Sequence, residues 1–140
     1  TDEKSENEGV TEETNEEESN NNKPTRILEE NGIDVNQGLE LLKDIDMYNM
    51  TINEFYEELE NKLKELKEYK DNEDMDNYSI LAHSLKTEAR YIGCNKLADM
   101  FYEHEKASKD NKIDFVIENY TKLKEESLRI HNIIKQYLNK

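Results

Sequence analysis

Proline is absent from the 116 residues that follow Pro24, so this long stretch contains no obligate helix breaker. Apolar residues recur through it at the i, i+3, i+4, i+7 spacing of amphipathic helices. Strand signals are missing, because β-branched residues do not alternate with polar ones. We therefore predict an all-α protein.

Capping residues mark where the helices are expected to begin. Asp34 is placed to cap a short helix, and Asp74 is placed to cap the helix that carries His83. A long helix is expected from about Asp46, and Asn95 is expected to cap a shorter one.

Turn residues mark where the helices are expected to end. An acidic turn covers 71–74, Gly93 is placed as a C′ glycine, and the pair Asp110-Asn111 leads into the last long helix. Short turns between long helices favour antiparallel neighbours. We predict an up-and-down antiparallel four-helix bundle with a short N-terminal helix.

Residues 1–24 differ from the rest of the chain in composition. Nine acidic residues stand against Lys4 and Lys23, and Val10 is the single aliphatic residue. Such a segment buries too little apolar surface to offset the entropy of ordering. We expect residues 1–24 to be a disordered acidic linker and residues 25–140 to form one domain with its own core.

The charge balance limits the classes of partner. A net charge of −15 argues against nucleic acid, whose binding needs a basic face. No apolar run approaches the roughly 20 residues that cross a bilayer. Cys94 is the single cysteine, which excludes an internal disulfide and fits a reducing cytosol. We expect a cytoplasmic location without membrane contact by this fragment, whether or not it belongs to a larger membrane-bound protein.

His83 stands on the polar side of a predicted helix. Counting 100° per residue, one apolar stripe on that helix contains Met75, Tyr78, Leu81, Ala82, Leu85, Ala89 and Ile92. His83 points roughly 140° away from the centre of this stripe. The same side holds Ser79, Thr87 and Arg90, and Lys86 lies at its edge. Packing does not explain a histidine there, which favours a chemical role.

The residues around His83 form a motif that begins Ala82-His83-Ser84-Leu85-Lys86. It resembles the pattern around the phosphorylated histidine of histidine-containing phosphotransfer (HPt) domains, and the resemblance extends over about residues 33–138. The matching positions are Ala82, His83, Leu85, Lys86, Ala89, Ile92, Gly93 and Leu97. Glu105 falls where the family tends to place a glutamate in the following helix. Thr87 departs from the pattern, because the family usually has glycine there.

The resemblance implies a phosphorelay carrier. His83 would accept a phosphoryl group from a receiver-domain aspartate, with Nε2 as the implied nucleophile, and pass it to another receiver domain. Imidazole suits this step because it is neutral yet nucleophilic near pH 7. Lys86 and Arg90, one and two turns after His83, can stabilise negative charge on the phosphoryl oxygens.

The implied partners are receiver domains of response regulators or hybrid sensor kinases. The chain is expected to bind them as a monomer. Ser79, Thr87 and Gly93 are the expected docking and access positions. Thr87 lies beside His83 on the helix, where it either narrows access to the imidazole or bonds the phosphoryl group. We expect no cofactor or metal on this chain, a magnesium ion on the receiver, and no kinase activity of its own.

Two other interpretations fit part of the pattern. Residues 83–87 resemble the phosphoacceptor box of the dimerising histidine-kinase hairpin, although Ser84 and Glu88 replace its acid and its proline. A non-catalytic helical adaptor bundle is the second alternative. Of the other histidines, His104 is expected to be packed or at the core boundary, and His131 is expected to be solvated or partly covered.

Overall fold

The computed structural model describes residues 24–140, and every regular element in that range is an α-helix. The helices are α2 (Arg26–Glu30), α3 (Val35–Leu42), α4 (Ile45–Asp71), α5 (Met75–Tyr91), α6 (Asn95–Lys109) and α7 (Ile113–Leu138). The prediction of an all-α protein is confirmed. The predicted linker lies outside the described residues except for Pro24. Between residues 24 and 140, no helix has both the length and the apolar character of a membrane span.

Aspartate side chains cap three of these helices. Asp34 and Asp74 each accept a hydrogen bond from the backbone N–H three residues further on, at 3.0 and 3.2 Å, which confirms both predicted caps. Asp44 does the same for α4 at 2.8 Å. That helix begins at Ile45, one residue before the expected Asp46.

The start of α6 differs from the prediction. Asn95 is the first helical residue, and the buried Cys94 takes the cap position without a side-chain hydrogen bond. The amide of Asn95 instead pairs with the amide of Gln37 from α3, through hydrogen bonds of 2.9 and 3.0 Å. The prediction of an Asn95 cap is wrong because this tertiary contact takes the side chain that would have capped the helix.

Turns of one kind join the four longest helices. These turns are residues 72–74, 92–94 and 110–112. The middle residue of each has a positive φ, 55° at Glu73, 86° at Gly93 and 55° at Asn111. In each turn the backbone N–H groups of the second and third residues bond back to carbonyls of the preceding helix, as in the Schellman motif.

Gly93 is the C′ residue of α5, as predicted, and it also anchors α3. Its carbonyl accepts a hydrogen bond of 2.9 Å from the backbone N–H of Asp34. The Asp34 backbone comes so close that a Cβ atom at position 93 would collide with it. Glycine is therefore required by both the positive φ and the close approach.

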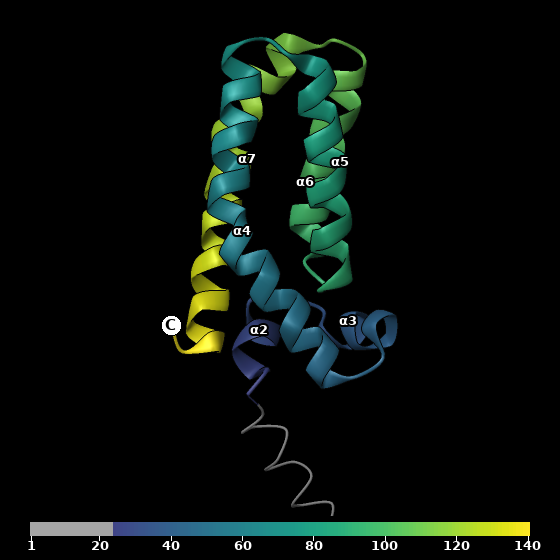
Figure 1. Cartoon of the computed structure of the whole chain (residues 1–140), viewed down its shortest axis with the longest axis vertical. Helices are drawn as coiled ribbons and strands as arrows, with labels where there is room; N and C mark the ends of the chain where they lie inside the picture. The colour runs from purple at the N-terminus through teal and green to yellow at the C-terminus, as the bar shows by residue number, and fades with distance from the viewer. Residues whose placement is uncertain (1–23) are drawn as a thin grey trace, which may run out of the picture.

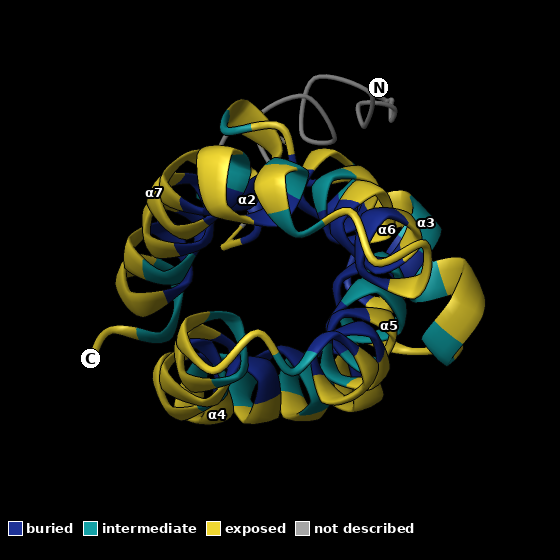
Figure 2. Ribbon diagram, turned by 90° about the horizontal axis from the view of Figure 1, so that it is seen from above, coloured by how far each residue is buried: buried dark blue, intermediate teal, exposed yellow. Residues whose placement is uncertain are grey.

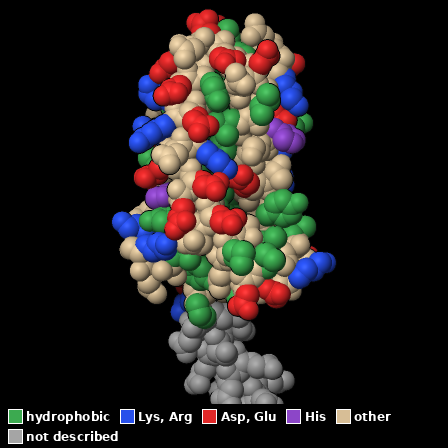
Figure 3. All heavy atoms as spheres, in the orientation of Figure 1, with side chains coloured by type: hydrophobic (Ala, Val, Ile, Leu, Met, Phe, Trp, Pro, Cys, Tyr) green, Lys and Arg blue, Asp and Glu red, His purple; other side chains and the backbone are tan. Residues whose placement is uncertain are grey.

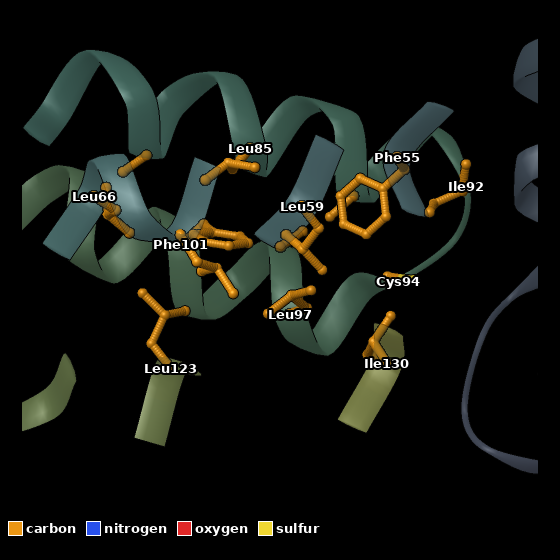
Figure 4. Packing of buried hydrophobic residues seen from close by; sticks show 14 of the residues in the cluster. Phe55, Leu59, Leu66, Leu85, Ile92, Cys94, Leu97, Phe101, Leu123 and Ile130 are labelled. Carbon is orange, nitrogen blue, oxygen red and sulfur yellow. The ribbon is translucent and has the colours of Figure 1, made fainter. Parts of the chain in front are cut away.

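The long helices α4, α5, α6 and α7 lie side by side around a shared core (Figure 1; Figure 2). Helix α5 packs most extensively against α6, while α4 and α7 complete the ring of neighbours. Buried residues line the inside of this ring, and the core includes Phe55, Leu59, Leu85, Leu97, Phe101 and Leu123 (Figure 4). Each buried side chain of this size contributes about 1.5–3 kcal/mol. The core fixes α5 against α6, and the candidate site lies between these two helices.

Two short helices lie near one end of the long ones (Figure 1). Helix α3 is the short helix that the sequence predicts, whereas α2 was not predicted. Leu28 of α2 is fully buried, and Arg129 of α7 donates to the backbone carbonyl of Asn31 at 3.4 Å. A five-residue helix is too short to be stable alone, so these contacts hold it.

Candidate functional site

His83 and Glu105 form the centre of the site. His83 lies in α5 with 58 % of its side chain exposed, on the polar side that the sequence predicts. Its Nδ1 atom lies 2.8 Å from Oε2 of Glu105, which comes from α6. The close packing of α5 on α6 therefore places an exposed imidazole directly against a carboxylate of the next helix.

The Glu105 carboxylate is buried and surrounded by cations. Only 5 % of its side chain is exposed. Lys86 Nζ lies 2.9 Å from Oε1, and Lys109 Nζ lies 3.0 Å from Oε2. The Lys86 contact is an ion pair without hydrogen-bond alignment, and within residues 24–140 Oε1 has no hydrogen-bond partner. Oε1 thus depends on the charge of Lys86, whereas Oε2 is shared by Lys109 and His83.

These contacts determine the ionisation of Glu105. Burial raises the pKa of its carboxyl, but the contacts with Lys86, Lys109 and His83 outweigh burial and bring the pKa from 4.5 to about 2. Glu105 is therefore an anion at every pH at which a histidine is a useful nucleophile.

The carboxylate decides which ring nitrogen of His83 carries the hydrogen. An ionised carboxylate can only accept a hydrogen bond, so the hydrogen between the two groups belongs to Nδ1. In the neutral ring the lone pair is then left on Nε2. The arrangement presents a nucleophilic nitrogen on an exposed side chain, with an anion behind the ring to stabilise positive charge.

Lys86 lies one turn after His83, as predicted, and its ammonium group contacts both Glu105 and Tyr102. Its side chain is only 19 % exposed, and its Nζ also lies over the ring of Tyr102 at 5.2 Å from the centroid. Lys106 approaches the same ring at 5.0 Å. Tyr102 is 41 % exposed, so it forms part of the surface next to the site.

Arg90 and Thr87 are held by other contacts. The guanidinium of Arg90 donates to Asp99 at 2.8 Å, and in residues 24–140 the structure gives it no contact with His83 or Glu105. The Thr87 hydroxyl donates to the backbone carbonyl of His83 at 3.2 Å. The hydroxyl is thus bonded within α5, at a position where the HPt motif that the sequence resembles usually has glycine.

Two predicted surface positions are buried. Ser79 was expected on the exposed side with His83, but it is only 7 % exposed and its hydroxyl donates to the carbonyl of Asp76. The expectation of an exposed Ser79 is therefore wrong, because the packed helices cover this side chain. Gly93 is also buried, and its place in the fold is the turn described above.

The other two histidines are placed as predicted. His104 is 2 % exposed, its Nδ1 lies 2.8 Å from the Tyr78 hydroxyl, and burial lowers its pKa from 6.5 to about 4. His131 is partly buried and stacks on Tyr56, with ring centroids 4.3 Å apart. In residues 24–140, no three His, Cys, Asp or Glu side chains converge as a metal site.

The sequence did not single out Lys109 or Tyr102. A signal was present, since Tyr102, Glu105 and Lys109 recur at helical spacing on α6. Comparisons of this chain with models of protein families, with curated proteins and with solved structures found no match. The functional interpretation therefore depends on the geometry around His83 and on the sequence motif.

Proposed function

We propose that this chain is a phosphorelay carrier of the HPt kind. His83 accepts a phosphoryl group from a receiver-domain aspartate and passes it to another receiver domain. The observation that carries this proposal is the 2.8 Å contact between His83 Nδ1 and the buried, ionised Glu105. It holds the proton on one ring nitrogen and leaves the other as an exposed nucleophile.

The proposal includes the arrangement of the long helices. We interpret α4 to α7 as an up-and-down antiparallel four-helix bundle, with α2 and α3 at one end. The three-residue turns and the ring of neighbouring contacts support this interpretation. In such a bundle one chain completes its own core, which favours a monomer over the dimerising kinase hairpin.

The proposed transfer needs no proton to leave His83. The Nε2 lone pair forms a bond to phosphorus, the bond from phosphorus to the aspartate oxygen breaks, and its electron pair stays on the aspartate as a carboxylate. The ring gains positive charge, which the Glu105 carboxylate stabilises through Nδ1–H. Lys86, one turn after His83 and paired with the same carboxylate, is the cation that we propose for the phosphoryl oxygens.

The surface near His83 suits a protein partner. Ile80, one turn before His83, is 67 % exposed, and Tyr102 is 41 % exposed. Acidic and basic side chains are interspersed over the face shown in Figure 3, where hydrophobic side chains form small groups between them. We propose that a receiver domain docks over His83 and supplies the magnesium ion, and that this chain is a cytoplasmic intermediate without kinase activity.

Phosphoryl transfer from a panel of phosphorylated receiver domains tests the proposal. Intact-mass spectrometry should find an acid-labile phosphoryl adduct on the wild type and none on His83→Gln. His131→Gln is the matched control, because His131 is also surface-accessible but stacks on Tyr56 away from Glu105. Labelling retained in His83→Gln, or a wild type that no receiver and no phosphoramidate labels, would overturn the proposal.

A further inference from the structure

Lys109 is the second cation on Glu105, and it lies in the last turn of α6. Its Nζ is 3.0 Å from Oε2, the oxygen that also accepts the hydrogen bond from His83. Its side chain is 62 % exposed, whereas that of Lys86 is 19 % exposed. The two lysines therefore hold the same carboxylate from different sides, one near the protein interior and one from solvent.

Lys86 cannot serve the phosphoryl group without weakening its contact with Glu105. The Lys86 ammonium is the ion-pair partner of Oε1, which has no hydrogen-bond partner within residues 24–140. If Lys86 turns toward a phosphoryl group on Nε2, this buried oxygen loses its cation. A buried carboxylate without a cation is costly, so the movement of Lys86 needs a second positive charge that stays with Glu105.

We infer that Lys109 is a positioning residue that supplies this second charge. It keeps Glu105 ionised and bonded to His83 while Lys86 moves from Oε1 to the phosphoryl oxygens. The inference rests on the proposed phosphocarrier function and concerns a residue outside the motif around His83. Lys109 itself need not touch the phosphoryl group, because it acts through the carboxylate.

The charges balance during this exchange. When Nε2 bonds to phosphorus, the ring becomes positive and stays bonded to Glu105 through Nδ1–H. Glu105 then keeps two positive neighbours, the ring and Lys109, and Lys86 is free to pair with the phosphoryl oxygens. When the group leaves for another aspartate, the ring becomes neutral again and Lys86 returns to Oε1.

A double-mutant cycle on Lys86 and Lys109 tests the inference. The rate of His83 labelling by phosphoramidate, which needs no cognate receiver, is followed by intact-mass spectrometry. Lys109→Met should slow labelling about fivefold, the size expected for one exposed ion pair. In the Lys86→Met background Lys109 is the lysine that remains on Glu105 within residues 24–140, so the same change should slow labelling by more than about fivefold.

The control is Lys106→Met, since Lys106 lies over Tyr102 and near Glu103 without contacting Glu105. Its labelling rate should equal that of the wild type. No loss for Lys109→Met in the wild-type background, or a loss in the Lys86→Met background that is no larger than in the wild type, contradicts the inference. If the double variant does not fold, the labelling rate of Lys109→Arg is the deciding measurement. Lys109→Arg should be labelled at the wild-type rate, and a loss as large as that of Lys109→Met overturns the inference. Failure of the proposed function would look different, since the wild type would then stay unlabelled or His83→Gln would be labelled.

Discussion

Replacing Glu105 with glutamine keeps the shape of the side chain and removes its charge. In the wild type this carboxylate is 5 % exposed and has contacts with His83, Lys86 and Lys109 at 2.8, 2.9 and 3.0 Å. Glutamine can still accept a hydrogen bond from Nδ1, but it cannot neutralise two ammonium groups. We therefore expect Glu105→Gln to fold and to be less stable at pH 7.

The pKa of Glu105 sets the size of the loss. Its shift from 4.5 to about 2 corresponds to about 3 kcal/mol, at 1.36 kcal/mol for each pKa unit. His83 and Lys109 are more than half exposed, so water screens part of this interaction. We expect Glu105→Gln to lower the free energy of unfolding at pH 7 by about 2 kcal/mol.

The pH dependence gives a sharper test than the loss itself. The pKa of Glu105 is lower in the folded state than in the unfolded state, so its contribution is present above pH 4.5. This contribution is lost as the pH falls from 4.5 toward 2. Urea unfolding followed by circular dichroism should therefore show the wild type and Glu105→Gln converging in stability over this range.

Glu103→Gln is the matched control on the same helix. Glu103 is 57 % exposed and its nearest cation is Lys106 at 3.9 Å, so the loss should stay below about 0.5 kcal/mol. A stability difference between the wild type and Glu105→Gln that does not change with pH would refute this reasoning. A difference at pH 7 no larger than that of Glu103→Gln would refute it as well.

Three further predictions concern stability and access. Because the pKa of His104 is lowered from 6.5 to about 4 by burial, the neutral ring stabilises the fold above pH 6.5, and about 3 kcal/mol is lost as the pH falls to 4. His104→Gln should lack this dependence of stability on pH when unfolding by urea is measured between pH 7 and pH 4. An unchanged pH dependence in the variant would contradict the role given to the neutral His104 ring. Gly93→Ala should lower the free energy of unfolding by about 2–4 kcal/mol, because its Cβ would collide with the Asp34 backbone. Gly32 has a similar φ but open space around it, so Gly32→Ala should cost only about 1 kcal/mol. Equal melting temperatures for the two variants would contradict the predicted collision. Thr87→Gly should speed labelling of His83 while costing no more than about 0.5 kcal/mol of stability, and a slower rate would mean that Thr87 assists transfer.

Local signals in the sequence predicted most helix boundaries. The carboxylates of Asp34 and Asp74 cap helices because they precede apolar periodic segments, and Gly93 ends α5 because its position requires a positive φ. Asn95 failed as a cap because Gln37, which is distant in sequence, bonds its side chain. Helix α2 was missed because tertiary contacts hold its five residues, and a periodicity count does not detect such contacts.

The candidate site was predicted only in part for a related reason. Helical spacing correctly placed His83 on the exposed side of α5 and Lys86 near it. The rotation of α6 against α5 decides which side chains meet across the helices, and no pattern within one helix fixes that rotation. It turns Arg90 to Asp99 and brings Glu105 to His83, whereas Lys109 meets Glu105 within α6 at the i, i+4 spacing.

Identification of the phosphorylated nitrogen tests the central claim most directly. After labelling of the ¹⁵N-enriched protein, correlation spectra of the imidazole ring report which nitrogen of His83 carries phosphorus and which carries hydrogen. The contact with Glu105 predicts phosphorus on Nε2 and hydrogen on Nδ1. Phosphorus on Nδ1 of His83, or on another side chain, would contradict the account.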